Sequence, residues 1–448
     1  MSAEPAHALS PAAVETVGII GLGYVGLPLA MALAKSGLRR VVGFDIDPAR
    51  VAEIAAGGDR TREVDPPVLA AANAAGIFAP TADEQALTDL DVYILTVPTP
   101  VDSDKRPDFR PLEGACRTVG SILKRRSATA APPIVVVEST VYPGVTEDIC
   151  GPAIEEASGR RAGIDFFLGY SPERINPGDR THTVDRIMKV VAGQTPEVAE
   201  RLKLLYGRAT TGGIFIARNI RTAEAAKVIE NAQRDLNVAF VNEVTMIFGR
   251  LGISIYDVLE TARTKWNFLD FRPGLVGGHC IGVDPFYLAS AAQAAGHEPE
   301  IILAGRRIND GMGDYFAGRI AEQCVARQPR TLVLGLTFKE NLPDLRNSKV
   351  VDLVQGLRAR GHAVDIHDPH ADPAQVQANF KLTLLPRLPS ADDLDAYDCL
   401  VGAVPHDAYR GFTPAHFAAL VKPGGLVADI KGMWRSVVLP DSFRRWQP

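Results

Sequence analysis

Residues 17–45, which read VGIIGLGYVGLPLAMALAKSGLRRVVGFD, decide the fold. An apolar strand runs into a turn built on Gly21, Gly23 and Gly26, and an alanine- and leucine-rich helix follows. A second strand then closes on Asp45. Three glycines between a strand and a helix, with an acid at the end of the next strand, are typical of a Rossmann unit that binds a dinucleotide.

Each part of this pattern has a physical task. The first glycine allows the tight turn, the second lets a pyrophosphate approach the backbone, and the third lets the helix pack closely on the strand. The helix N-terminus offers free N–H groups and a partial positive charge to the pyrophosphate. The Asp45 carboxylate can accept a hydrogen bond from a ribose 2′-hydroxyl and would repel a 2′-phosphate, so we predict NAD as the cofactor.

Three further strand-like segments lie at residues 91–100, 133–144 and 166–174. Strands that alternate with helices over this length predict a parallel, doubly wound sheet. Ligands bind such sheets beyond the carboxyl ends of the strands, which places the predicted site near residues 96–100, 138–140 and 171–174.

The pattern then changes to a long helix, which we predict to span roughly thirty residues with Thr222 as its N-cap. Lys227 and Asn231 are four positions apart and therefore share one face of this helix.

The last third of the chain repeats the first. Residues 331–371 again form a strand, a glycine turn, a helix and a strand that ends at an acid, Asp368. This second half lacks a complete GxGxxG, so we expect it to bind a smaller nucleotide. The fold class is therefore α/β, with two Rossmann-like, doubly wound parallel-sheet domains joined by a central helical region that contains one long helix. The predicted parts are a flexible tail at 1–13, an NAD-binding domain at 14–212, a central helical and dimerisation domain at 213–322, and a nucleotide-binding domain at 323–448.

The composition is that of an ordinary globular protein. Of 448 residues, 46% are hydrophobic and 23% are charged, and the net charge is −5. These values give no basis for a nucleic-acid partner, and no apolar run approaches the ~18 residues of a membrane span. The first residues lack the basic start and apolar core of a signal peptide, and the five cysteines are odd in number and scattered. We therefore expect a cytoplasmic protein with no disulfide framework and no membrane or nucleic-acid partner.

One cysteine, Cys280, lies in the glycine-rich stretch PGLVGGHCIGVD at residues 273–284. It could be a small buried hydrophobe, a metal ligand beside His279, or a nucleophile. No second Cys/His pair with ligand spacing accompanies His279, so we predict no metal site. The other cysteines occupy apolar contexts and are expected to be packing residues: Cys116, Cys150, Cys324 and Cys399.

An ordered set of motifs favours the nucleophile. The chain contains GLGYVGLPLA, FDIDPAR, VPTP, ESTVYPG, SPERINPGD, EAAKVIENAQRDLN, TKWNFLDFRPGLVGGHCIGVDP, AGRRIND and LTFKENLPDLRNS in this order. In these motifs it resembles the nucleotide-sugar 6-dehydrogenases along nearly its whole length, and most of all their UDP-N-acetylglucosamine and UDP-N-acetylgalactosamine branch. The resemblance implies oxidation of a sugar C6 hydroxyl to a carboxylate, with two NAD reduced and a covalent thioester formed on the enzyme.

The resemblance also assigns catalytic roles. Cys280 is the nucleophile that holds the sugar first as a thiohemiacetal and then as a thioester. Lys227 and Asn231 stabilise oxyanions at C6, one through its charge and the other through a directed N–H.

Three further residues complete the predicted catalytic set. Asp284 and Thr140 match positions that hold a catalytic water, and Glu173 matches the base for thioester hydrolysis. Lys227, Asp284 and water all remain candidates for removing the first proton.

The remaining candidates bind the ligands. Lys339 and Arg272 match positions that meet the UDP phosphates, and Arg272 can reach the site of a neighbouring subunit. The predicted cofactor contacts are Gly21, Gly23, Tyr24, Val25, Gly26, Asp45, Arg50, Thr99, Thr140 and Arg346. The predicted substrate contacts are Glu173, Arg174, Lys227, Asn231, Arg272, Gly277 and Lys339. The long helix is a candidate interface for a homodimer or a higher homo-oligomer.

Two positions bear on the sugar. Pro177 and Val283 stand where the UDP-glucose branch commonly has an acid and a lysine, and both favour an N-acetylated sugar; UDP-N-acetylmannosamine and UDP-glucose are the alternatives. Among rival classes, nucleotide-sugar epimerases need a Tyr-x-x-x-Lys pair, which none of the ten tyrosines provides. A single-step hydroxyacid dehydrogenase would have no use for Cys280, and a catalytically silent nucleotide-sugar sensor would have no use for the intact catalytic set.

Overall fold

The computed structural model describes residues 14–127, 129–174, 181, 183, 185–278, 280–389 and 396–448. The predicted tail at 1–13 and two residues used in the sequence argument, Pro177 and His279, lie outside this described part. The chain forms two compact units, which we describe one at a time. The first comprises Met1–Glu230 with Phe286–Gly296, and the second comprises Asn231–Pro285 with His297–Pro448.

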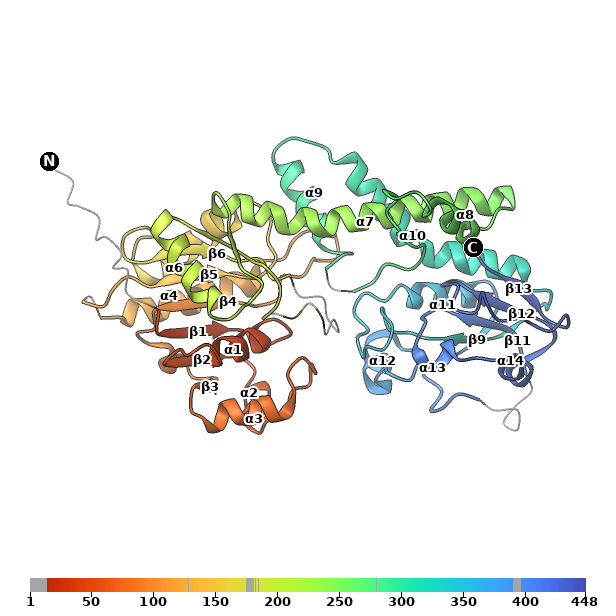
Figure 1. The fold of residues 1–448 in the computed structure, drawn as a ribbon, viewed down its shortest axis with the longest axis horizontal. Helices are drawn as coiled ribbons and strands as arrows, with labels where there is room; N and C mark the ends of the chain where they lie inside the picture. The colour runs from red at the N-terminus through yellow and green to blue at the C-terminus, as the bar shows by residue number, and fades with distance from the viewer. Residues whose placement is uncertain are drawn as a thin grey trace. The chain divides into compact units, whose positions relative to one another are not determined.

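The first unit is built on an eight-stranded sheet in the order β3-β2-β1-β4-β5-β6-β7-β8. Strands β3 to β6 of this sheet are labelled in Figure 1. Neighbouring strands are parallel except for β6 and β7, which are antiparallel. The order from β3 to β6 is that of a doubly wound dinucleotide-binding sheet. The strands are β1 (Thr16–Ile20), β2 (Arg40–Phe44), β3 (Phe78–Thr81), β4 (Val92–Leu95), β5 (Ile134–Val137), β6 (Phe167–Tyr170), β7 (Lys189–Gly193) and β8 (Ile214–Ile216).

Helices join the strands of this sheet and complete its core. The central strands are short runs of valine, isoleucine and leucine that are buried along their whole length, as expected for a parallel sheet covered on both faces. The helices are α1 (Gly26–Ala34), α2 (Pro48–Ala55), α3 (Pro66–Ala74), α4 (Arg110–Arg125), α5 (Gly151–Ser158) and α6 (Pro196–Gly207), with one 3-10 turn at Glu84–Leu87 and one π-helical turn at Thr146–Cys150.

The predicted long helix is present as α7 (Ile220–Leu251), which has 32 residues. The prediction that Thr222 is the N-cap of this helix is wrong, because the helix already begins at Ile220. The Oδ1 atom of Asn219 accepts a hydrogen bond from the backbone N–H of Thr222 at 2.8 Å, so Asn219 supplies the capping contact. Three further helices follow: α8 (Ile255–Ala262), α9 (Asp284–Ala294) and α10 (Glu300–Gln323).

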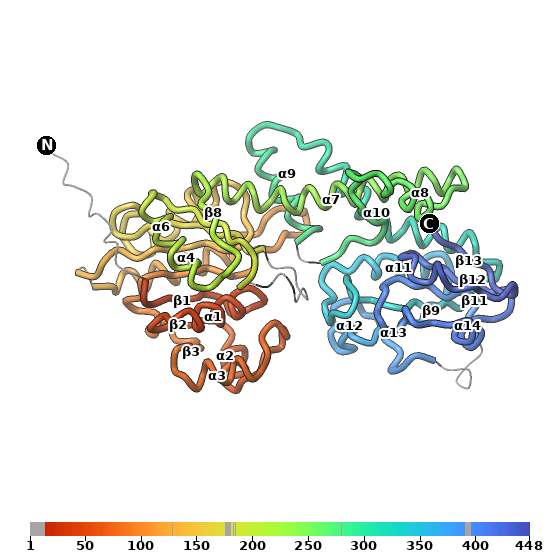
Figure 2. The backbone as a smooth tube through the Cα atoms, viewed as in Figure 1, coloured from red at the N-terminus to blue at the C-terminus, as the bar shows by residue number. Residues whose placement is uncertain are grey.

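The second unit contains the second Rossmann-like sheet, which is parallel throughout in the order β10-β9-β11-β12-β13. Its first three strands repeat the β2-β1-β4 arrangement of the first sheet, as the repeat in the sequence predicts. The strands are β9 (Arg330–Leu334), β10 (Ala363–His367), β11 (Tyr397–Gly402), β12 (Val421–Asp429) and β13 (Arg444–Trp446). The helices are α11 (Val350–Ala359), α12 (Pro373–Phe380), α13 (Asp407–Arg410) and α14 (Pro414–Leu420); Figure 2 traces the chain through both sheets by colour.

Small residues bring α10 against α11 within the second unit. A Cβ atom on Gly313 would lie 2.7 Å from the Cβ atom of Asp352, and one on Gly356 would lie 2.7 Å from that of Ala317. The predicted fold class, with two Rossmann-like sheets and a helical region, is therefore confirmed. Among the described residues, no helix is long and apolar enough to cross a membrane.

Candidate active site

The glycine turn after β1 has the geometry that a dinucleotide needs. Gly21 has a φ of +98° and donates its N–H to the Phe44 carbonyl oxygen at 2.8 Å. A Cβ atom on Gly26 would lie only 1.9 Å from the Gly21 oxygen, whereas one on Gly23 would meet nothing within 4 Å. The turn is therefore closed by backbone contacts on one side and open at Gly23, where a pyrophosphate would approach. These residues fit NAD.

Asp45 and Arg50 both contact this turn. The Asp45 carboxylate accepts the N–H of Leu22 at 2.8 Å and that of Asp47 at 3.0 Å, and the residue is only half-buried. Arg50 is 5% exposed; its Nε donates to the Leu22 carbonyl oxygen at 2.9 Å and its Nη2 lies 2.7 Å from Asp59. Asp45 thus keeps exposed surface for a ribose, while Arg50 braces the turn. The predicted contacts Tyr24 and Val25 immediately precede α1, and Tyr24 is 37% exposed.

The predicted residues Thr99 and Thr140 come together beyond β4 and β5. The Thr99 hydroxyl donates to the Thr140 carbonyl oxygen at 2.8 Å. Tyr287 of α9 donates its hydroxyl to the Thr99 carbonyl oxygen at 2.5 Å. Sequence reasoning did not identify Tyr287, because its partner is 188 residues away in the chain.

Helix α7 holds the loop that contains Thr140. The Glu224 side chain is fully buried and accepts the N–H of Gly144 at 2.6 Å and that of Thr146 at 2.9 Å. Burial raises the pKa of Glu224, although these hydrogen bonds favour its ionised form. One turn further along α7, Lys227 is buried, with 7% exposure.

Glu173 lies beyond the end of β6 at the same edge of the sheet and is 8% exposed. Its Oε2 atom is 3.2 Å from the Nζ atom of Lys189, and its Oε1 atom accepts the N–H of Arg174 at 2.6 Å. The Arg174 guanidinium is paired with Glu230 at 2.6 Å. The structure therefore places the predicted base in a buried charged cluster whose lysine the sequence did not reveal.

Asn231 and Asp284 meet in the second unit. The Asn231 Nδ2 atom donates to an Asp284 carboxylate oxygen at 2.5 Å, and both residues are buried. The N–H of Asp284 in turn donates to the Cys280 carbonyl oxygen at 2.8 Å, so Cys280 lies one turn before α9. Cys280 forms no disulfide and is only half-buried, as is the predicted packing residue Cys324, whereas Cys116, Cys150 and Cys399 are fully buried.

The glycines before Cys280 pack against the segment after β9. A Cβ atom on Gly277 would lie 2.8 Å from the Asn347 carbonyl oxygen, and Gly278, with a φ of +90°, would meet the Phe338 ring at 2.8 Å. The Asn347 side chain donates to the Gly278 carbonyl oxygen at 3.0 Å. No residue with a side chain fits here, so the glycines allow the close approach of the two loops.

A cavity of about 410 Å³ lies in the second unit. Three predicted substrate contacts, Arg272, Gly277 and Lys339, line it. Arg272 is half-exposed and lies 3.3 Å from Asp270. Arg346, predicted to contact the cofactor, is paired with Asp344 at 2.5 Å in the same unit.

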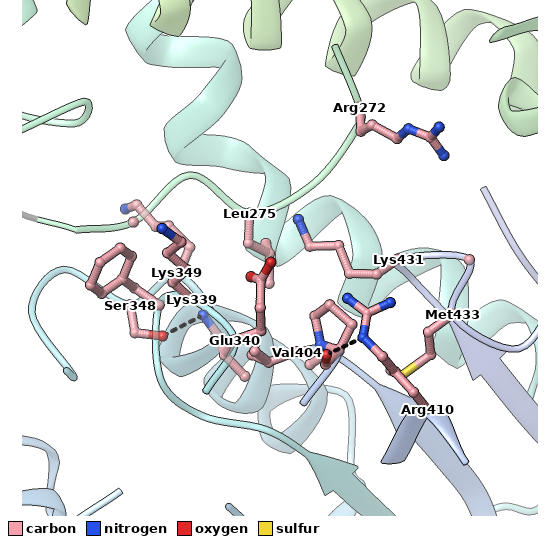
Figure 3. Close-up of a pocket in the computed structure, with 16 residues that line it drawn as sticks. Arg272, Leu275, Lys339, Glu340, Ser348, Lys349, Val404, Arg410, Lys431 and Met433 are labelled. Carbon is pink, nitrogen blue, oxygen red and sulfur yellow. Dashed lines mark hydrogen bonds between the residues drawn. The ribbon is translucent and has the colours of Figure 1, made fainter. Parts of the chain in front are cut away.

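The same cavity has cationic residues that the sequence analysis missed. Lys431 and Arg410 line it, and the side chains of Lys431 and Glu340 point towards one another (Figure 3). Burial lowers the pKa of Lys431, and Glu340 opposes that shift. Arg410 donates to the Pro405 carbonyl oxygen at 2.9 Å. With Lys349, five cations and one carboxylate line this cavity, and such a lining suits a pyrophosphate. Neither Lys431 nor Arg410 lies in a motif that marked it as a ligand contact.

The first sheet with its glycine turn, the cationic cavity and the half-buried thiol define the chain as an NAD-dependent dehydrogenase of nucleotide-bound substrates. Family comparison specifies the group: the chain belongs to the UDP-glucose/GDP-mannose dehydrogenase family. The NAD binding domain of that family matches residues 15–210, its central domain residues 221–311, and its UDP binding domain residues 332–436. The predictions of the family, of an oxidoreductase and of NAD as its cofactor are confirmed.

Individual relatives agree with this assignment. The chain is 47% identical to the UDP-N-acetyl-D-glucosamine 6-dehydrogenase of Pseudomonas aeruginosa, over 93% of this chain and 96% of that protein. It is 43% identical to the protein of the same name from Salmonella typhi, over 93% of this chain and 95% of that protein. Among solved structures, a UDP-D-ManNAc dehydrogenase from Pyrococcus horikoshii superposes with a TM-score of 0.84 at 28% identity, covering 96% of this chain and 98% of that one.

Proposed function

We propose that this protein oxidises the C6 hydroxyl of UDP-N-acetylglucosamine to a carboxylate and reduces two NAD in doing so. One observation carries the choice of sugar. The relatives named for UDP-N-acetyl-D-glucosamine are 47% and 43% identical to this chain, whereas relatives named for N-acetyl-D-galactosaminuronic acid and UDP-N-acetyl-D-mannosamine are 32% identical. UDP-N-acetylgalactosamine is the second candidate. Val283, buried directly before Asp284, is consistent with an N-acetylated sugar.

The proposed chemistry divides among the residues of the chain. NAD, when bound at the glycine turn, supplies the hydride acceptor. The Cys280 sulfur adds to the C6 aldehyde and holds it covalently, first as a thiohemiacetal and then as a thioester. The Lys227 ammonium and the Asn231 amide stabilise the negative charge that develops on the C6 oxygen. Asp284 orients the Asn231 amide through their hydrogen bond.

Hydrolysis of the thioester completes the reaction. A water adds its oxygen to the thioester carbon, Glu173 takes a proton from that water, and the C–S bond breaks with its electron pair on Cys280. Thr140 and Asp284 are the proposed partners of the water. In the cavity of the second unit, Lys339, Lys431 and Arg410 hold the pyrophosphate of the substrate.

We also propose a homo-oligomer, supported by a stripe of exposed apolar residues on α7. Four large side chains are between 47% and 64% exposed, and their spacings of eleven, seven and four residues put them on one helical face: Ile229, Phe240, Ile247 and Leu251. Phe240→Asp is expected to lower the molar mass measured by light scattering. A cytoplasmic location is proposed on chemical grounds, because the five cysteines, all of them described, form no disulfide and Cys280 must stay reduced.

A panel of substrates tests the proposed function. Purified protein is mixed with NAD and UDP-linked N-acetylglucosamine, N-acetylgalactosamine, N-acetylmannosamine or glucose, and NADH and sugar acid are counted. We expect two NADH per sugar acid and the highest kcat/KM with UDP-N-acetylglucosamine. One NADH per sugar with a stable aldehyde, or no NADH with any of the four, would contradict the proposal. Cys280→Ala should form no sugar acid.

A further inference from the structure

A buried charge cluster surrounds Glu173 in the first unit. Glu138 follows the carboxyl end of β5 and Glu173 follows that of β6, and these two strands are parallel. Strand β7 runs antiparallel to β6, so its first residue, Lys189, comes to the same edge of the sheet. Helix α6 packs on β7 and contributes Tyr206.

The contacts within this cluster are specific. The Lys189 Nζ atom lies 2.9 Å from a Glu138 carboxylate oxygen and 3.2 Å from a Glu173 carboxylate oxygen. The Tyr206 hydroxyl donates to the other Glu138 oxygen, and the Lys189 ammonium lies over the Tyr206 ring at 5.4 Å. The side chain of Lys189 is 3% exposed and that of Glu138 is fully buried. One ammonium therefore joins two carboxylates away from water.

The charges in this cluster are strongly coupled. Burial raises the pKa of Glu138, and the nearby charge of Glu173 adds to that shift while Lys189 opposes it. Burial lowers the pKa of Lys189, but the two carboxylates outweigh burial and the pKa is raised. A buried carboxylate without a cationic partner would take up a proton instead of staying ionised. The lysine is thus the group that allows a carboxylate to stay charged here.

We propose that Lys189, anchored by Glu138 and Tyr206, is the positioning residue that holds Glu173 in place, with a positive charge beside it, as the base for thioester hydrolysis. This inference rests on the proposed function, which gives Glu173 that role. Lys189 directs one Glu173 oxygen and the N–H of Arg174 directs the other, at 2.6 Å. Among the residues that the structure describes, the Arg174 guanidinium and its partner Glu230 on α7 are further charged groups beside Glu173.

Replacement of the lysine tests the role directly. In Lys189→Met the Glu173 and Glu138 carboxyls lose the cation between them, so the ionised form of the base is disfavoured. We expect the steady-state rate to fall by about 100-fold or more, the lower end of the usual contribution of a general base, while the first burst of NADH is retained. Intact-protein mass spectrometry should show the sugar acyl group accumulating on Cys280. The matched control is Lys203→Met, which changes an exposed lysine on α6 that pairs with Glu200.

The pH dependence separates this role from a merely structural one. A base accepts a proton only when it is ionised, so thioester hydrolysis should become faster as pH rises. Lys189→Met removes an opposite charge and should move that rise to higher pH. Glu138→Gln removes a like charge and should move it to lower pH. Opposite shifts are not expected from two variants that only loosen the fold. If Lys189→Met does not fold, the downward shift in Glu138→Gln alone still tests the inference.

The outcomes distinguish this inference from the proposed function. The role of Lys189 alone would be overturned by the following combination. Wild-type protein makes two NADH per sugar, but Lys189→Met and Glu138→Gln show no acyl-enzyme and no shift in the pH profile. Wild-type protein that makes no NADH from any UDP-sugar would overturn the function on which it rests. Acyl-enzyme in Lys189→Met with opposite pH shifts in the two variants would support the inference.

Discussion

The two Rossmann halves share one turn but use it differently. Gly21 and Gly335 have φ values of +98° and +93°, and each donates its N–H, at 2.8 Å, to the residue that precedes the acid of the next strand. Those acids, Asp45 and Asp368, each accept an N–H from the residue after the glycine, at 2.8 Å and 2.6 Å. The backbone of the turn is therefore the same in both halves.

The side chains around the two turns differ. Asp45 is half-buried and accepts two backbone N–H groups, whereas Asp368 is 6% exposed and accepts four. His406, from the loop after β11, lies 3.1 Å from the Asp368 carboxylate. Thr337 stands where the first half has the open Gly23, and it is fully buried. The shared turn is therefore not sufficient for a dinucleotide site. Such a site also requires the open glycine and the accessible acid of the first half.

The largest effect is expected where a side chain would close the first turn. Gly26→Ala places a Cβ atom 1.9 Å from the Gly21 oxygen, so the helix must move away from the strand. We expect NADH affinity, measured by fluorescence titration, to fall by roughly 100-fold or more because the pyrophosphate depends on that helix N-terminus. In the second half, Gly335→Ala would clash with Val404 at 2.4 Å and should lower Tm without changing NADH affinity.

A matched control for both glycines is available in α4. Gly114→Ala meets nothing within 4 Å and lies inside a helix, so it should raise stability by about 0.5–1 kcal/mol and leave NADH affinity unchanged. A loss of NADH affinity in Gly114→Ala, or an unchanged affinity in Gly26→Ala, would contradict the comparison.

The two acids should give opposite phenotypes. Asp45→Asn removes the charge that repels a 2′-phosphate, and we expect the preference for NAD over NADP to fall by about 10-fold with little change in Tm. Asp368→Asn disturbs a buried network and should cost about 2–3 kcal/mol in the free energy of unfolding without altering cofactor preference. Kinetics with both cofactors and urea unfolding measure the two effects. A change in cofactor preference in Asp368→Asn would mean that the second turn also contacts NAD.

The same pair predicts a difference in acid stability. Burial alone would raise the pKa of Asp368, but His406 and the backbone N–H groups of Leu336 and Thr337 hold it well below its ordinary range. A depressed carboxyl pKa stabilises the fold above the unfolded value of about 4 and loses that contribution as pH falls. Wild-type protein should therefore lose more stability between pH 6 and pH 3 than Asp368→Asn does. Equal losses in urea unfolding at the two pH values would refute this.

Much of the fold was predictable because its signals are local. The glycine turn, the apolar strands and the long helix with Lys227 and Asn231 on one face can each be recognised within a few tens of residues. The partners of the site residues are not local. Lys189 reaches Glu173 only because β7 runs antiparallel to β6, and no pattern in the sequence fixes that direction.

The same limit applies elsewhere in the molecule. Lys431 follows β12 and Arg410 ends α13, yet both line the cavity that contains Lys339. Their contribution depends on the order of strands in the second sheet. The N-cap of α7 is a local example in which the sequence alone does not determine a contact. Asn219 and Thr222 are both good capping residues, and only the backbone geometry decides between them.

The smallest effect is expected for a double variant that should leave the number of bound NADH molecules unchanged, and this variant tests the comparison of the two turns most directly. Thr337→Gly with Glu340→Gly restores three glycines after β9, in the spacing of the first half. Asp368 would still be covered by His406, so no ribose could reach its carboxylate. Isothermal titration should therefore still give one NADH per chain. A second NADH site in this double variant would show that the three glycines alone suffice to bind a dinucleotide. An accessible acid would then not be required.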